Sequence, residues 1–128
     1  MHNGNIADFP LFKRRLQADL PDDIFATVKG NTDSEWSFAL LLSKVRYLPN
    51  DRGPFVELSL QIPDPKSRSF LPEVLRKAML DTIASLNKYA EDVGVTEPSL
   101  MNFCVTDGSS IVVTRYISSR KDEAASLV

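Results

Sequence analysis

Reactive side chains are scarce in this chain of 128 residues, which has one cysteine, one histidine and one tryptophan. A single cysteine cannot form an intramolecular disulfide, so nothing in the sequence indicates an oxidising compartment. A structural zinc site takes four cysteine or histidine ligands, and an iron facial triad takes two histidines. We therefore expect no metal site and no cofactor, and the inventory of catalytic groups is small.

The chain also lacks an excess of positive charge and any long apolar run. Its 15 Lys+Arg and 17 Asp+Glu residues give a formal net charge of -2, which disfavours nucleic acid as a partner. The most apolar stretch, 38–42, is far shorter than the roughly 20 residues of a membrane helix. Residues 1–11 lack the basic and apolar regions of a signal peptide. We expect a cytoplasmic globular domain with no membrane partner.

Two helices are predicted in the first 30 residues. Apolar residues recur at helical spacing at Ile6, Phe9, Phe12 and Leu16. Asp8 is the predicted cap of this helix, and Pro10 lies in its first turn. The segment 19–23 combines a cap candidate, a proline and acidic residues, which predicts a second, short helix that ends at Gly30.

Two stronger helices follow. Thr32 and Glu35 fit the S/T-x-x-E capping box, and the apolar run 36–45 predicts a helix covered on more than one face. The longest predicted helix covers 71–93 and ends at Gly94. Its apolar stripe, which we interpret as core, consists of Leu71, Leu75, Met79, Ile83, Leu86, Ala90 and Val93.

The remaining segments favour irregular structure and strands. Between 47 and 70 prolines and glycine interrupt the chain, with one possible strand at 55–60. Segments 100–105 and 111–117 are rich in β-branched and aromatic residues, and Asp107-Gly108 between them indicates a hairpin. Helices followed by a hairpin predict an α+β fold in which helices pack on an antiparallel sheet. With so few strands, that sheet is expected to be incomplete.

Two side chains are individual candidates for a functional role, one as a nucleophile and one as a substrate contact. Cys104 lies in the middle of a predicted strand, and the only histidine, His2, is near the N-terminus, so we interpret Cys104 as a buried, unreactive thiol. Asp33 lies where a loop enters a buried helix, where the helix dipole favours a carboxylate. Its residue pattern alone favours a helix-capping role over a substrate contact.

The segment His2-Asn3-Gly4 is the other distinctive feature. Asn-Gly is a common turn dipeptide, so the pair is a weak signal by itself. However, the Asn3 side-chain amide and the Gly4 backbone N–H together form a suitable pair of donors for an oxyanion. A residue without a Cβ also permits close approach to its backbone.

The order of these motifs resembles the class II (N-terminal nucleophile) glutamine amidotransferase domain, and in particular the amidotransferase subunits of fungal glutathione-degrading complexes. The motifs are His2-Asn3-Gly4 before a helix, and residues 30–35 opening an apolar helix. Further similar stretches are 97–100, 105–108, 114–116 and 122–127. Each motif has modest specificity, whereas their order and spacing together are more specific.

This resemblance implies a fold, a substrate and roles for three residues. The fold would be part of the four-layer αββα sandwich of Ntn hydrolases. Asn3 and Gly4 would form the oxyanion hole, and Asp33 would bind the α-ammonium of glutamine or a γ-glutamyl peptide. The resemblance also implies that the protein hydrolyses amides in glutathione breakdown and has a protein partner in the degrading complex. Thr32 and Glu35 remain structural.

One feature departs from the family pattern. The family nucleophile is a cysteine at the processed N-terminus, whereas Met1 directly precedes the His-Asn-Gly motif here. We therefore expect residues 1–128 to form a single partial glutamine amidotransferase type-2 domain that lacks its N-terminal strands and C-terminal remainder, and that is inactive alone. The alternatives are a non-catalytic protein-interaction module and a small α+β domain whose motifs match by chance.

Overall fold

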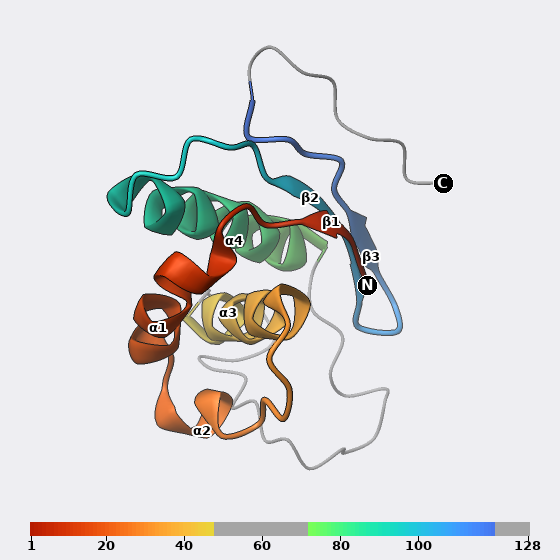
Figure 1. The fold of residues 1–128 in the computed structure, drawn as a ribbon. Helices are drawn as coiled ribbons and strands as arrows, with labels where there is room; N and C mark the ends of the chain where they lie inside the picture. The colour runs from red at the N-terminus through yellow and green to blue at the C-terminus, as the bar shows by residue number, and fades with distance from the viewer. Residues whose placement is uncertain (48–71, 120–128) are drawn as a thin grey trace.

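Helices pack on one face of an antiparallel sheet in the computed structural model, which describes residues 1–47 and 72–119 (Figure 1). The elements in chain order are β1 (His2–Asn5), α1 (Phe9–Asp19), α2 (Asp22–Phe25), α3 (Asp33–Tyr47), α4 (Pro72–Asp92), β2 (Leu100–Thr106) and β3 (Ile111–Val113). The sheet has three strands in the order β1-β2-β3. The chain is thus α+β, as predicted, and the four-layer sandwich remains a prediction.

The first two helices begin differently from the prediction. Asp8 occupies the N-cap position of α1, but it has a left-handed backbone with φ of 49° and makes no side-chain capping hydrogen bond. Its carbonyl oxygen instead accepts a hydrogen bond from the N–H of Leu11 at 2.9 Å. Helix α2 is only four residues long and is followed by Ala26 as its C-cap. Gly30 therefore does not end it, because the chain leaves the helix well before that glycine.

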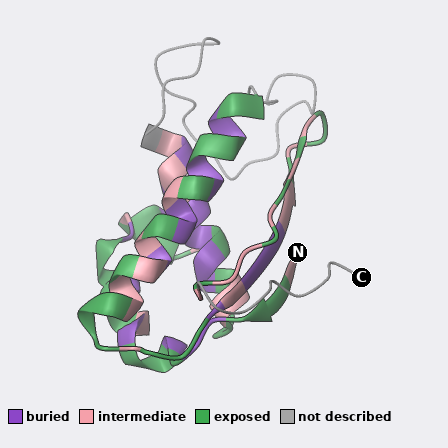
Figure 2. Cartoon of the chain, turned by 90° about the horizontal axis from the view of Figure 1, so that it is seen from above, coloured by how far each residue is buried: buried purple, intermediate pink, exposed green. Residues whose placement is uncertain are grey.

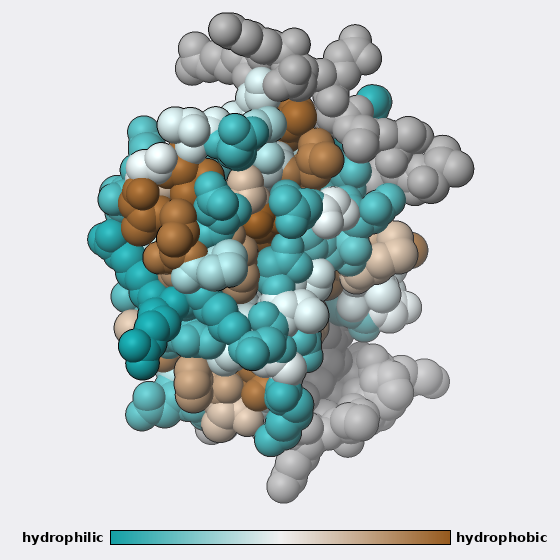
Figure 3. Space-filling model, viewed as in Figure 1, coloured by the Kyte–Doolittle hydropathy of each residue, from teal (hydrophilic) through white to brown (hydrophobic). Residues whose placement is uncertain are grey.

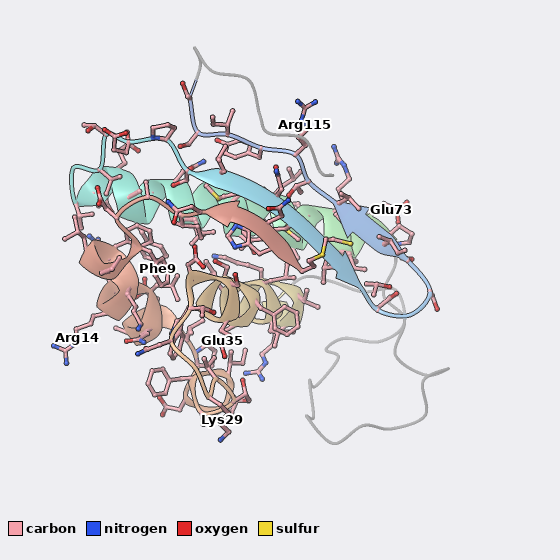
Figure 4. The ribbon with its side chains drawn as sticks, turned by 45° about the vertical axis from the view of Figure 1, so that its right-hand side comes forward. Phe9, Arg14, Lys29, Glu35, Glu73 and Arg115 are labelled. Atoms are coloured by element: carbon pink, nitrogen blue, oxygen red, sulfur yellow. The ribbon has the colours of Figure 1, made fainter. Side chains whose placement is uncertain are left out.

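Helix α3 begins at the predicted capping box. The Glu35 N–H donates to Thr32 Oγ1 at 3.2 Å, and the Thr32 N–H donates back to Glu35 Oε2 at 3.1 Å. Figure 4 shows Glu35 in the first turn of α3, on the side of that helix nearer α2. Trp36, Leu40, Leu41 and Val45 are buried, although Phe38 is 53% exposed, so the predicted cover on several faces is nearly complete.

Helix α4 supplies the longest part of the core. Of its predicted stripe, four residues are buried: Leu75, Met79, Ile83 and Leu86. Figure 2 shows the buried residues of the helices on the sides that face one another and the sheet. Val93 lies beyond the core and is 37% exposed. Gly94, with φ of 78°, ends the helix as predicted, and the Val95 N–H closes the last turn on the Ala90 carbonyl at 2.9 Å.

The predicted hairpin is present, but its second strand is shorter than expected. Asp107 Oδ1 accepts hydrogen bonds from the Ser109 and Ser110 N–H groups, and Gly108 has φ of 92°, so the turn depends on these residues. After Val113 the pairing with β2 is reduced to single contacts, including a bridge between Leu100 and Ile117. Strand β1 was not predicted, because its polar residues lack any strand pattern.

Some predictions fall on residues outside the described ranges. These are the irregular stretch 47–70 apart from Tyr47, the possible strand 55–60, the start of the predicted helix at Leu71, and the motif 122–127. Within residues 1–47 and 72–119, no helix combines the length and apolarity that crossing a membrane requires.

Candidate functional site

Strand β1 lies at one edge of the sheet, and among the described residues no strand pairs with its outer side. Met1 and Cys104 exchange two backbone hydrogen bonds, with the N-terminal amine on the Cys104 carbonyl at 2.7 Å and the Cys104 N–H on the Met1 carbonyl at 2.8 Å. Hydrogen-bonded and non-hydrogen-bonded pairs alternate along an antiparallel ladder. The Gly4–Met101 pair lies three positions along the ladder from the hydrogen-bonded Met1–Cys104 pair, so it is a non-hydrogen-bonded pair. The N–H of Gly4 therefore points away from β2.

Asp33 lies against this same edge. The N–H of Ile6, one residue beyond the strand, donates to Asp33 Oδ2 at 3.1 Å, which ties the start of α3 to the end of β1. The Asp33 side chain remains 23% exposed. Thr32 supplies the side-chain cap of α3, so the helix-capping role that the residue pattern favoured for Asp33 is wrong. Its carboxylate faces the strand instead.

The spacing of these groups fits a glutamine side chain. Antiparallel strands rise about 3.4 Å per residue, so the N–H groups of Gly4 and Ile6 lie about 7 Å apart along the edge. From standard bond lengths, the side-chain carbonyl oxygen and the α-nitrogen of extended glutamine are about 5–6 Å apart. A carbonyl on the Gly4 N–H therefore leaves the α-ammonium within hydrogen-bonding reach of Asp33.

Asn3 lies next to the Gly4 N–H on the other face of β1. It pairs with Asn102, whereas its neighbours His2 and Gly4 pair with Phe103 and Met101, which are buried against the helices. Because side chains alternate along a strand, Asn3 points to the face away from the helices. It is exposed, so its amide is accessible to a ligand that binds at the edge.

Gly4 has a structural reason to be glycine, independent of any role in binding. Its φ of 154° is unfavourable for residues with a side chain. A Cβ at this position would overlap the carbonyl oxygen of Leu100 on β2. The neighbouring strand thus occupies the room left by the absent side chain, so this room is not free for a ligand.

Two side chains near Asp33 had no predicted role. His2 Nδ1 lies 2.9 Å from Ser34 Oγ and 3.9 Å from Asp33 Oδ1, and its side chain is only 4% exposed. Its contacts join β1 to the first turn of α3, which are distant in sequence. The only local signal was the position of His2 beside Asn3-Gly4, which by itself does not reveal a contact across elements.

Cys104 is not placed to attack a carbonyl bound at the edge. It is half-buried rather than fully buried, which corrects the prediction for this thiol. It lies on the central strand β2, on the far side from the Gly4 N–H, and three residues, or about 10 Å, from the partner of Gly4. The described residues also contain no group of three or more His, Cys, Asp or Glu side chains that could hold a metal ion.

A small cavity adjoins this region without containing it. Its volume is about 120 Å³, and it lies between α3, α4 and the strands β1 and β2. Its lining includes Phe38, Leu41, Met79 and Phe103 together with His2 and Ser34. Asn3, Gly4 and Asp33 do not line it, so the edge of β1, not this cavity, holds the three predicted site residues.

Comparison with known proteins supports the resemblance given by the motifs. The chain is 42% identical, over 99% of its length, to the probable glutamine amidotransferase DUG3 of Saccharomyces cerevisiae. It spans 34% of the length of that relative. Identity at this level over nearly the whole chain excludes a chance match of short motifs. No family model matches the chain, and no solved structure matches it.

Proposed function

We propose that this chain is part of a glutamine amidotransferase type-2 domain that binds γ-glutamyl amides and acts in glutathione breakdown. The similarity to a probable glutamine amidotransferase supports this assignment. The assignment includes the αββα fold of Ntn hydrolases, a cytoplasmic location and a protein partner in a degrading complex. Glutamine and γ-glutamyl peptides share the same γ-carbonyl and α-ammonium groups, so both belong to the proposed substrate class.

The three site residues have separate roles in this proposal. In the family reaction a thiolate attacks the γ-carbonyl, ammonia or an amine leaves, and water then releases glutamate from the thioester. The carbonyl oxygen becomes an oxyanion in each tetrahedral intermediate. The Asn3 amide and the Gly4 N–H would stabilise that charge, and one such donor is worth about 3 kcal/mol of barrier in enzymes generally. Asp33 would orient the substrate through its α-ammonium.

The observation that carries the proposal is the shared edge of Gly4 and Asp33. One N–H directed outward and one partly exposed carboxylate lie on the same side of β1, with Ile6 fixing the carboxylate at 3.1 Å. A γ-glutamyl carbonyl bound at the Gly4 N–H would leave the α-ammonium of the ligand within hydrogen-bonding reach of Asp33, because the Gly4 and Ile6 N–H groups lie about 7 Å apart along the strand. The exposed Asn3 amide adjoins the position of the carbonyl oxygen.

Binding of L-glutamine tests this proposal. We expect chemical-shift changes at the Gly4 and Asp33 amides, and weaker binding of glutaric acid monoamide, which lacks the α-ammonium. Asp33→Asn should abolish the difference between the two ligands, because the lost ion pair is the source of that difference. Asp22→Asn, which alters an exposed carboxylate in the first turn of α2, is the matched control and should preserve it. Equal binding of both ligands to the unaltered chain would refute the proposal.

We also propose that the chain binds these ligands without hydrolysing them. Its one thiol, at Cys104, lies on β2, which pairs with the opposite edge of β1 from the one that holds the proposed site. No ammonia release from glutamine is therefore expected from the purified chain. Labelling of Cys104 by a thiol-reactive glutamine analogue, if glutamine blocks it, would show that this cysteine serves as the nucleophile and would contradict the expectation.

A further inference from the structure

His2 occupies a more constrained position than either of its neighbours in the motif. Its ring packs on Phe103 with centroids 4.6 Å apart, and both ring nitrogens have partners. Nε2 lies 3.2 Å from the Leu100 carbonyl oxygen, and Nδ1 lies 2.9 Å from Ser34 Oγ. The ring therefore lies between β1, β2 and the first turn of α3.

These contacts determine where the hydrogens lie. A carbonyl oxygen only accepts, so the bond to Leu100 places a hydrogen on Nε2. In a neutral ring Nδ1 then has a lone pair and accepts the hydroxyl hydrogen of Ser34. A serine hydroxyl has one hydrogen, so Ser34 cannot donate simultaneously to a second acceptor.

The second acceptor within reach of the Ser34 hydroxyl is the carboxylate of Asp33, which is the proposed binding group for the substrate ammonium. Ser34 Oγ lies 3.4 Å from Asp33 Oδ1, and the other carboxylate oxygen of Asp33 already accepts from the Ile6 N–H. If Ser34 donated to Oδ1, both oxygens would have internal donors. An incoming ammonium would then compete with the Ser34 hydroxyl for Oδ1.

We propose that His2 is a positioning residue that draws the Ser34 hydroxyl hydrogen away from Asp33 and so reserves Oδ1 for the α-ammonium of the substrate. This inference rests on the proposed function, because it concerns how the proposed site binds the α-ammonium of its ligand. This role for His2 accounts for the contact between Nδ1 of its buried ring and the Ser34 hydroxyl. His2 itself does not contact the substrate.

The test measures the ratio of the dissociation constants of glutaric acid monoamide and L-glutamine. His2→Phe keeps the ring on Phe103 and frees the Ser34 hydroxyl to turn to Asp33, so the ratio should fall about fivefold to tenfold, as for one hydrogen bond. The double variant His2→Phe/Ser34→Ala removes the competing donor and should restore the ratio. Ser34→Ala alone should leave the ratio unchanged.

A role limited to packing predicts a different pattern. The double variant would then bind no better than His2→Phe, and that result would overturn the inference. So would an unchanged ratio in a folded His2→Phe variant. If His2→Phe does not fold, His2→Asn provides a second variant, because its side-chain oxygen can accept from Ser34 in place of Nδ1. It should keep the ratio of the unaltered chain, and a fall would contradict the inference.

A measurement without ligand separates this inference from the proposed function. The ¹⁵N resonances of the neutral His2 ring in the folded chain should show a hydrogen on Nε2 and none on Nδ1. A hydrogen on Nδ1 would direct the Ser34 hydroxyl toward Asp33 and overturn the inference whatever the ligand results. Equal binding of both ligands to the unaltered chain, with the expected tautomer present, would instead refute only the proposed function.

Discussion

Gly4 combines an unusual backbone angle with close contact to a neighbouring strand, and these two effects can be separated. Gly4→Ala should lower the free energy of unfolding by about 3 kcal/mol, because it adds overlap with the Leu100 carbonyl to backbone strain. Gly94 is a matched control, since it also has a positive φ but has open space around it. Gly94→Ala should cost about 1 kcal/mol, for strain alone. Equal losses in urea unfolding would contradict the overlap.

Asn3 and Asn5 form a natural pair for testing the oxyanion assignment. Both are exposed and, two residues apart on β1, they point to the same face. Substitution of either by alanine should change stability by less than about 0.5 kcal/mol. Asn3→Ala should weaken glutamine binding about fivefold, as expected for one lost hydrogen bond, and Asn5→Ala should not. Calorimetric titration checks this, and equal losses would place the carbonyl elsewhere on the strand.

Individual site residues differed in how far the sequence could identify them. Asn3, Gly4 and Asp33 belong to short motifs, so the resemblance alone was enough to propose them, and their roles remain a prediction. The shared edge of Gly4 and Asp33 could not be, because it depends on which residues of β1 pair with β2. The contact of His2 with Ser34 joins positions 32 residues apart in the chain and has no local signal.

The start of α3 shows how a local sequence signal stabilises a helix that positions the site. Thr32→Ala removes the side-chain cap and should lower the free energy of unfolding by about 1 kcal/mol. The hydrogen bonds from the Thr32 N–H and then from its hydroxyl lower the pKa of Glu35 below its ordinary value. Asn31→Ala, in the same exposed loop, should have a smaller effect in thermal unfolding. An equal effect would show that the cap contributes little.

The same capping box predicts that the stability of the fold depends on pH in the acidic range. A carboxyl group whose pKa is lower in the folded state stabilises that state above its unfolded pKa, and the stabilisation is lost as the pH falls through the folded pKa. We therefore expect the contribution of Glu35 to be complete at neutral pH and to vanish on acidification. The difference in stability between the unaltered chain and Glu35→Gln should close over that range.

Elements with local signals were predicted better than elements fixed by distant contacts. The capping box, the stop at Gly94 and the Asp107-Gly108 turn each depend on hydrogen bonds within a few residues. Asp8 failed as a side-chain cap because the chain turns there from β1 into α1 with a left-handed residue. Strand β1 exists because β2 lies beside it, and its own residues give no strand pattern.

Helices that are far apart in the chain are joined by Tyr89. Its hydroxyl donates to Asp19 Oδ2 at 2.6 Å, which ties α4 to the end of α1, and its ring stacks on Phe12. Tyr89→Phe keeps the ring and should lower the free energy of unfolding by about 1 kcal/mol. Tyr116→Phe, which loses the hydrogen bond from Asn87, two residues before Tyr89 in α4, is the comparison and should have an effect of similar size. Urea unfolding measures both.

Tyr89 also predicts the behaviour of the whole fold in alkali. Burial, and then the hydrogen bond to Asp19, raises the pKa of Tyr89 above its ordinary value. A group whose pKa is raised by folding stabilises the folded state below its unfolded pKa, about 10 for tyrosine, and loses that effect as the pH rises. The stability difference between the unaltered chain and Tyr89→Phe should therefore shrink above about pH 10. A constant difference would contradict this.

The arrangement of the layers could be predicted more readily than the surface. Helical stripes and the hairpin predicted helices packed on a sheet, and the core consists mainly of those stripes. On the face shown in Figure 3, hydrophobic residues form separate patches within a mostly hydrophilic surface. Apolar side chains make up much of the surface of ordinary proteins, so these patches do not by themselves identify an interaction surface.

The contact between Gly4 and Leu100 has a consequence for how this protein can evolve. Architecture alone restricts position 4 to glycine, because the neighbouring carbonyl oxygen occupies the space of a side chain. Position 3 has no such restriction, since its side chain is exposed. A descendant that lost its chemistry would therefore drift at Asn3 while retaining Gly4. Under the proposed function, active homologues would therefore retain asparagine at position 3 for its chemistry, whereas the fold alone would retain glycine at position 4.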